Sequence, residues 1–177
     1  VRDMAPDDRV RRRAQRALDS LTSHCVAWLI STPHRADGKG GSDLIDVAFP
    51  PEDSAAQVEW KPLMVTNPNQ PGNFDLGDQA DCCAYVKTSI FAPVEQKVQF
   101  EMGSDDGIKV WVNGEVIHSK NAARAVNCGE DKVQVTLREG WNPVMLKITQ
   151  GGGGWGFCCA VRNPEGGRIE GLRYKAE

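Results

Sequence analysis

Two of the five tryptophans, Trp111 and Trp155, stand where an indole ring could bind a ligand. Trp111 alternates with Val110 and Val112, so in a strand it would point away from the face that those valines share. Trp155 follows four consecutive glycines, and a tryptophan on a flexible loop is well placed to stack on the apolar face of a sugar ring. The glycines could instead let two backbones approach closely, with Trp155 folded down as a plug. The other tryptophans are expected in the core or at strand ends.

Polar residues that could complete a saccharide site lie between the predicted strands. Asn121 and Arg124 could hydrogen-bond hydroxyl groups, and the guanidinium could pair with a uronate or sulfate in bidentate fashion; the alternative is a polar loop in water. Catalysis has little support, because the three histidines are scattered and no triad spacing is present. The glycine run lacks the Gly-Lys-Ser/Thr of a phosphate-binding loop. The many carboxylates leave a glycoside-hydrolase pair open, but no two of them are marked out.

The cysteine content bears on the cellular compartment. The six cysteines are Cys25, Cys82, Cys83, Cys128, Cys158 and Cys159. Their spacing matches no structural zinc site. An even set favours up to three disulfides and therefore an oxidising compartment, whereas the alternative is buried free thiols in a reduced cytosol. Within each adjacent pair, one side chain would face the core and the other would face out. We expect the pair at 82–83 to lie near the pair at 158–159, on neighbouring strands.

Composition narrows the class of protein. The chain has 177 residues, with 21 Lys plus Arg against 24 Asp plus Glu, for a net charge of −3. This near balance argues against a dedicated nucleic-acid binder, which usually has a basic surface. The apolar runs fall far short of the roughly 20 residues that cross a bilayer, so no membrane span is expected. The 18 glycines and 10 prolines indicate many turns and short strands.

One amphipathic helix is predicted over residues 7–21, where apolar side chains recur at spacings of three and four. Its arginine-rich face, within residues 9–16, is either a solvated surface or a patch that binds phosphate or nucleic acid. Because the rest of the chain indicates strands and turns, we interpret this helix as the end of a preceding helical region. The expected domains are a helical appendage over 1–22 and a β-sandwich over 23–177.

Period-two alternation of apolar and polar residues predicts the strands of this sandwich. A first strand runs to Pro33, and the stretch 34–78 is expected to form loops around one end of the sandwich, with a weak strand at 58–65. Asn113-Gly114 is the strongest hairpin signal, because both central positions of such a turn need positive φ. Further strands are expected over 84–91, 98–102, 108–112, 115–118, 133–137, 144–148 and 157–161, with a closing strand near 169–172. Many short strands joined by turns predict an all-β, jelly-roll β-sandwich.

The segment 103–114, GSDDGIKVWVNG, resembles a stretch of the protective-antigen-like lectin domains and related galactose-binding-domain-like sandwiches. Residues 133–142, VQVTLREGWN, are similar to the next strand and turn of that family. The resemblance covers roughly residues 84–161, and the first third of the chain does not match. The chain is also similar to sandwich modules that follow HEAT-type helical repeats in large bacterial secreted or envelope proteins. That likeness implies neighbouring domains in a larger chain.

The resemblance implies a calcium site. In the lectin-like members, two adjacent aspartates hold a calcium ion that also contacts sugar hydroxyls, and Asp105 and Asp106 match those positions. Calcium takes six to eight oxygen ligands, and Asn121, Gln150 and backbone carbonyls could complete the shell. The alternative is that Asp-Asp-Gly serves only as turn chemistry, because Asp bonds its own backbone and Gly takes positive φ.

These observations predict a non-catalytic carbohydrate-binding module of a larger secreted or envelope protein, located outside the cytoplasm, with a polysaccharide or glycan as partner and calcium as a candidate cofactor. The saccharide-binding candidates are Trp111, Asn121, Arg124, Gln150 and Trp155. Two alternatives stay open: a structural or protein-interaction sandwich without a sugar site, and a glycan-active enzyme. The fold alone does not choose among them, because function depends on the site.

Overall fold

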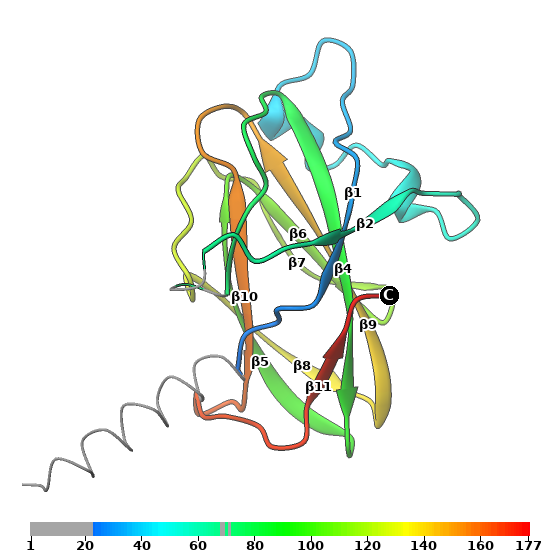
Figure 1. The fold of residues 1–177 in the computed structure, drawn as a ribbon, viewed down its shortest axis with the longest axis vertical. Coiled ribbons are helices and arrows are strands. Elements are labelled where there is room, and N and C mark those ends of the chain that lie inside the picture. Colours follow the sequence, from blue (N-terminus) through cyan, green and yellow to red (C-terminus); the bar gives the residue numbers. More distant parts are fainter. Residues whose placement is uncertain (1–22, 68–69, 71) are drawn as a thin grey trace, which may run out of the picture.

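The computed structural model describes residues 23–67, 70 and 72–177, so the predicted helix over 7–21 and the appendage 1–22 lie outside the described residues. Two antiparallel sheets stack face to face and enclose a common core (Figure 1). The larger sheet has the order β2-β1-β4-β9-β6-β7, and β11 pairs with β4. Its strands are β1 (Trp28–Ser31), β2 (Trp60–Leu63), β4 (Cys82–Ala92), β6 (Ile108–Val112), β7 (Glu115–Lys120), β9 (Gly140–Gln150) and β11 (Arg173–Lys175). The prediction of an all-β sandwich is confirmed.

The smaller sheet has the order β3-β10-β5-β8. Its strands are β3 (Asn73–Asp75), β5 (Gln96–Asp105), β8 (Asp131–Leu137) and β10 (Gly156–Arg162). From β4 onward the chain crosses between the two sheets at every connection except the β6–β7 hairpin, which gives the jelly-roll connectivity that the sequence predicts. In that hairpin, Asn113 and Gly114 take φ values of 54° and 84°, as its two-residue turn requires.

The core lies between the sheets and is built from the inward positions of the alternating strands. Val98, Phe100 and Met102 of β5 face Leu146 and Ile148 of β9 across the sandwich, and all five side chains are fully buried. An aromatic cluster adds to this core, because the ring of Phe157 lies 5.3 Å from that of Trp28 and 5.2 Å from that of Phe74. Burial of this apolar surface is the main stabilising contribution to the fold.

The stretch 34–58 departs from the prediction of loops around one end of the sandwich. It contains the short 3-10 helices η1 (Gly41–Leu44) and η2 (Pro50–Glu52), and it covers part of the outer face of the larger sheet. Leu44 packs there against the outward side chains of Cys83 and Tyr85. The fully buried Lys147 donates hydrogen bonds to the carbonyls of Ile45 and Val47, which satisfies its ammonium group beneath this cover.

One disulfide joins Cys128 to Cys158, and the other four cysteines are buried free thiols. The expectation of up to three bridges is therefore corrected to one. The side chains of each adjacent pair do face opposite ways: Cys82 and Cys159 lie in the main core, whereas Cys83 joins the outer cluster and Cys158 forms the disulfide. The expectation that the two pairs lie on neighbouring strands is wrong, because β4 and β10 belong to different sheets. Burial raises the pKa of Cys83 to about 12, so this thiol stays protonated at neutral pH.

In the part of the chain that the structure describes, no helix is long and apolar enough to cross a membrane.

Candidate functional site

Asp106 holds together three loops at one end of the sandwich. It follows the end of β5, and its carboxylate accepts the backbone N–H of Arg124 at 3.0 Å and that of Gly151 at 2.8 Å. Its own backbone N–H donates to the carbonyl of Thr149 at 3.0 Å. The acidic turn, the loop 121–130 and the glycine loop 151–154 therefore meet at one carboxylate. The short local pattern Asp-Asp-Gly indicated the turn, but not its distant partners.

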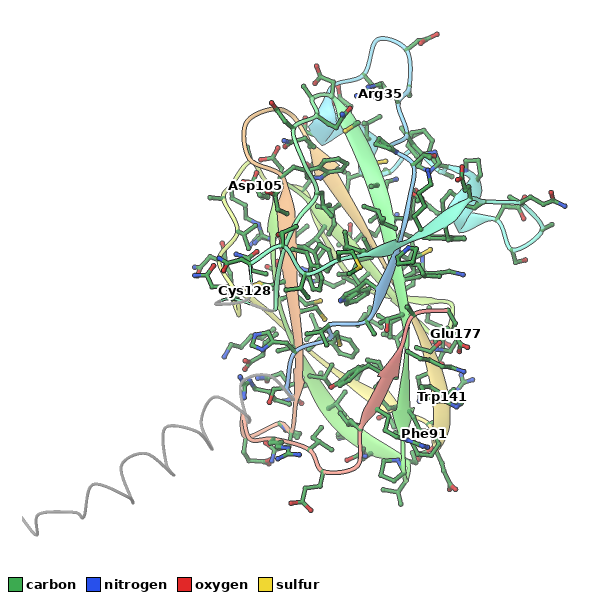
Figure 2. All side chains as sticks on the ribbon, viewed as in Figure 1. Arg35, Phe91, Asp105, Cys128, Trp141 and Glu177 are labelled. Atoms are coloured by element: carbon green, nitrogen blue, oxygen red, sulfur yellow. A yellow bond between two sulfur atoms is a disulfide. The ribbon has the colours of Figure 1, made fainter. Side chains whose placement is uncertain are left out.

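Asp105 lies at this end of the sandwich (Figure 2). It lines a cavity of about 350 Å³. Within the described residues, no hydrogen-bond donor reaches its carboxylate. Burial raises the pKa of Asp105, and the negative charge of Asp106 raises it further. The glycine loop passes so close that a Cβ atom at Gly154 would lie 3.0 Å from Oδ2 of Asp105. Asp105 is thus a partly buried acid at the wall of a cavity, beside a second acid and without a neutralising partner among the residues that the structure describes.

Short polar side chains form much of the remaining wall of this cavity. They are contributed by the segment before β3 and by β3 itself, and they include Thr66, Asn67, Gln70, Asn73 and Asp75. Hydroxyl, amide and carboxylate groups in a concave site suit a ligand that is rich in hydroxyl groups. These residues are absent from the sequence prediction, which assigned the stretch 34–78 to loops. The one signal in the sequence that could have indicated ligand binding by this stretch is its high content of polar residues.

Trp155 lies at the same cavity but is folded down into the protein, with 3% of its surface exposed. Its indole Nε1 is buried and has no hydrogen-bond partner among the described residues, whereas its backbone carbonyl accepts the N–H of Leu76. The predicted loop indole is therefore a wall of the site rather than an exposed platform. The second interpretation of the glycine run, close backbone approach with a buried plug, matches this arrangement.

Gln150 supports the cavity indirectly, because its side chain holds the glycine loop in place. It is fully buried at the end of β9, and its Nε2 donates to the carbonyls of Gly153 at 3.1 Å and Gly154 at 2.9 Å. The side chain thereby fixes the loop that borders Asp105. Its Oε1 is buried and lacks a partner within the described residues. Gln150 does not line the cavity and is a supporting residue of this site.

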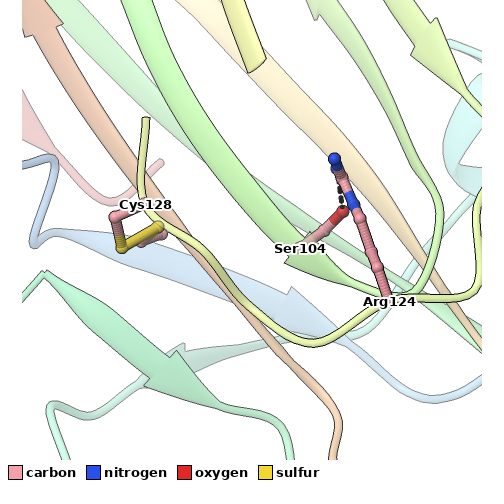
Figure 3. The surroundings of a disulfide bond; sticks show 4 residues. Ser104, Arg124 and Cys128 are labelled. Carbon is pink, nitrogen blue, oxygen red and sulfur yellow. Dashed lines mark hydrogen bonds between the residues drawn. A yellow bond between two sulfur atoms is a disulfide. The ribbon is translucent and has the colours of Figure 1, made fainter. Parts of the chain in front are cut away.

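Arg124, a predicted ligand for acidic sugars, is engaged inside the protein. Its side chain is 10% exposed, forms an ion pair with Asp131 and donates to Ser104 at 2.8 Å (Figure 3). Burial alone would raise the pKa of Asp131, but hydrogen bonds from Arg124 and Lys120 outweigh it and keep that pKa below its ordinary value. The prediction is corrected accordingly, because a guanidinium with these partners is not free to bind a uronate. Arg124 positions the loop whose N–H binds Asp106.

Asn121 and Trp111 lie outside the cavity. Asn121 donates from Nδ2 to the carbonyl of Ser42 at 2.9 Å, which ties its loop to η1. Trp111 points outward from the larger sheet, as predicted, but it packs 6.3 Å from the ring of Tyr85 and lines a different cavity. Of the seven predicted site residues, the structure thus brings Asp105 and Trp155 to one cavity, supports them with Asp106, Gln150 and Arg124, and places the other two elsewhere.

The donor set at Asp105 and Asp106 fits a hard cation in part. Two adjacent carboxylates supply charge; the pKa of Asp105 is raised first by burial and then by the charge of Asp106, and a bound cation would relieve that repulsion. Within the described residues, however, no group of three or more His, Cys, Asp or Glu side chains could hold a metal ion. A calcium ion here would need backbone or amide oxygens and ligand hydroxyls to complete its shell.

Comparisons with known proteins describe what the chain is similar to. No family model matches it, and no curated protein matches its sequence. Among solved structures, a PA14 sugar-binding domain from an RTX adhesin is similar with 25% identity and a TM-score of 0.40, covering 52% of this chain and 51% of that one. This chain thus spans about half the length of that structure.

Two further structures show the same kind of partial likeness. The PA14 domain of the MpAFP antifreeze protein has 15% identity and a TM-score of 0.44, covering 85% of this chain and 72% of that one. A family 35 carbohydrate-binding module from an environmental isolate has 15% identity and a TM-score of 0.38, covering 58% and 84%. The expected HEAT-type repeat finds no support in these comparisons. Because these TM-scores lie below 0.5, the case for a function rests on the geometry of the site.

Proposed function

We propose that this domain binds carbohydrate, without catalysis, in the cavity beside Asp105. The observation that carries the proposal is an acid to which no described residue donates a hydrogen bond, at the wall of a cavity of about 350 Å³, among amide and hydroxyl side chains and one indole. A sugar hydroxyl can donate to such a carboxylate, and the polar wall offers both donors and acceptors to neighbouring hydroxyls. The preformed loops lower the cost of ordering the site on binding.

Calcium is part of the proposal as a co-ligand. Asp105 and Asp106 would hold the ion, which would supply a Lewis-acidic contact for hydroxyl oxygens. Gly151 and Arg124 already donate N–H groups to Asp106 and so keep its carboxylate in place before any ion arrives. The Cys128–Cys158 disulfide supports an extracytoplasmic location for the module, as part of a larger secreted or envelope protein.

A glycan array probed with and without calcium tests the proposal, followed by titration of the best ligand. Asp105→Asn is expected to weaken binding at least about tenfold, because it removes a charged acceptor that faces the ligand. Glu139→Gln is the matched control: it removes the same charge from an exposed side chain in the β8–β9 turn, away from the cavity. Equal binding by the wild type and Asp105→Asn, or no binding to any glycan, would show the proposal to be wrong.

A further inference from the structure

A second concave site lies on the outer face of the larger sheet, beside the segment 34–58 that covers part of that face. It is a groove of about 550 Å³, larger than the cavity beside Asp105, and the two share no lining residue. Its volume falls within the range of typical ligand sites. Nothing in the proposed function uses it.

The floor of the groove is apolar although its side chains point outward. Met145 of β9 lies in register with Trp111 of β6 on one side and with Lys87 of β4 on the other. Pro143 lies two residues from Met145 and so on the same face of β9. The outward positions of a solvated antiparallel sheet are ordinarily polar. An indole, a thioether and a proline ring thus lie side by side on this face; Trp111 and Met145 pack in part against the cluster of Leu44, Cys83 and Tyr85, and the surface that they leave open lines the groove.

The indole of Trp111 is fixed in place. The ring of Tyr85 lies 6.3 Å from it, and Nζ of Lys109 lies 5.7 Å from its centroid. Tyr85 is itself fully buried and donates its hydroxyl to Glu52. A ring held in this way forms a rigid platform, and binding to it would cost little side-chain entropy.

The rim offers hydrogen-bonding groups, and its two carboxylates are already paired with lysines. Lys87 lies over the ring of Trp60, with Nζ 4.7 Å from its centroid, Glu177 pairs with Lys175, and Glu52 accepts from Lys147 at 3.2 Å. Ser54 and Ser89 add hydroxyl groups to the lining. The rim therefore carries donors and acceptors and little net charge, since Lys87 is its one cation outside an ion pair among the described residues, and this suits a neutral ligand with many hydroxyls.

The position of the groove on a sheet face excludes one common mode of peptide binding. The backbone groups of β4, β9 and β6 are paired with neighbouring strands along the floor. A peptide could not add as a further strand here, because that mode needs a free sheet edge. A flat apolar ring bordered by hydroxyl, amino and carboxylate groups instead matches the two faces of a pyranose chain, one apolar and one polar.

We infer that this groove binds a neutral oligosaccharide chain, with one sugar ring stacked on Trp111 and its hydroxyls directed to Lys87 and Ser54. This second site extends the proposed carbohydrate-binding function and rests on it. It differs in chemistry from the cavity beside Asp105, because it lacks the acidic pair and needs no metal ion. One domain would then hold a glycan at two places, which raises its avidity for a polymer.

The test is titration of neutral oligosaccharides (cellohexaose, xylohexaose and mannohexaose) in the presence of EDTA, with polygalacturonate as the charged comparison. Trp111→Ala is expected to weaken binding of a neutral chain by about tenfold or more, whereas Trp111→Phe retains part of it because a flat ring remains. Trp141→Ala is the matched control, since this indole is 41% exposed on the same strand as Met145 but does not line the groove. Thermal unfolding of each variant checks that the fold is intact.

The outcomes separate this site from the proposed function. Loss of binding in Trp111→Ala, with binding retained in Asp105→Asn and Trp141→Ala, supports the groove. Unchanged binding in Trp111→Ala, or binding that only Asp105→Asn abolishes, overturns the groove and leaves the proposed function in place. If the wild type binds none of the neutral probes in EDTA, the groove is likewise overturned, while calcium-dependent binding on the array still decides the proposed function.

Discussion

The disulfide between Cys128 and Cys158 is expected to stabilise both the fold and the cavity beside Asp105. It closes a loop with a sequence separation of 30, for which the chain-entropy relation gives about 3.6 kcal/mol at 25 °C. One end of the bridge, Cys128, lies in the loop 121–130, which also holds Arg124, whose backbone N–H binds the Asp106 carboxylate. Replacing both cysteines by alanine is therefore expected to lower the free energy of unfolding by about 3 kcal/mol and to weaken glycan binding at the cavity.

Urea denaturation without reductant measures the first effect, and titration of the array-selected glycan measures the second. Wild-type protein in dithiothreitol is the control, because it keeps the cysteine side chains but loses the bond. Dithiothreitol should lower the stability of the wild type towards that of the variant and leave the variant unchanged. If the two proteins unfold within about 0.5 kcal/mol of each other without reductant, other contacts hold the loop and the reasoning is refuted.

Three further results are expected. The pKa of Asp131 is held below its ordinary value in the folded state. Its contribution to stability is therefore present above the unfolded pKa and is lost as the pH falls through the folded pKa. Urea denaturation curves between about pH 6 and pH 2 should show this loss in the wild type and a smaller loss in Asp131→Asn. Gly41→Ala should destabilise the domain by about 2 kcal/mol or more in thermal unfolding, since its Cβ would lie 2.2 Å from the backbone oxygen of Gln150; an unchanged midpoint would contradict that close approach. Alkylation of unfolded, unreduced protein should label the four free cysteines. A count of two would contradict this and show an additional bridge, for which peptide mapping should first examine Cys25 and Cys159, because their backbones are hydrogen-bonded at 2.9 Å.

The amino-acid sequence by itself determined the class of fold and most of its strands. Alternation of apolar and polar residues is a local property, and it predicted the inward faces of β5, β6 and β9 as well as the hairpin at Asn113-Gly114. The strand β3 was missed because three residues carry too little alternation to stand out from a long polar stretch.

Only the tertiary structure decided which candidate residues share a site. The sequence placed Arg124 in a polar loop, and only the structure shows that β8 brings Asp131 beside it. The sequence left Trp155 open between an exposed platform and a buried plug, and only the structure shows that it is buried at the cavity. Trp111 points outward as its period predicts, yet it faces the groove on the larger sheet and not the cavity beside Asp105. The physical reason is the same in each case: the partners that bury or neutralise a side chain come from strands in other parts of the chain, and sequence spacing does not encode those contacts.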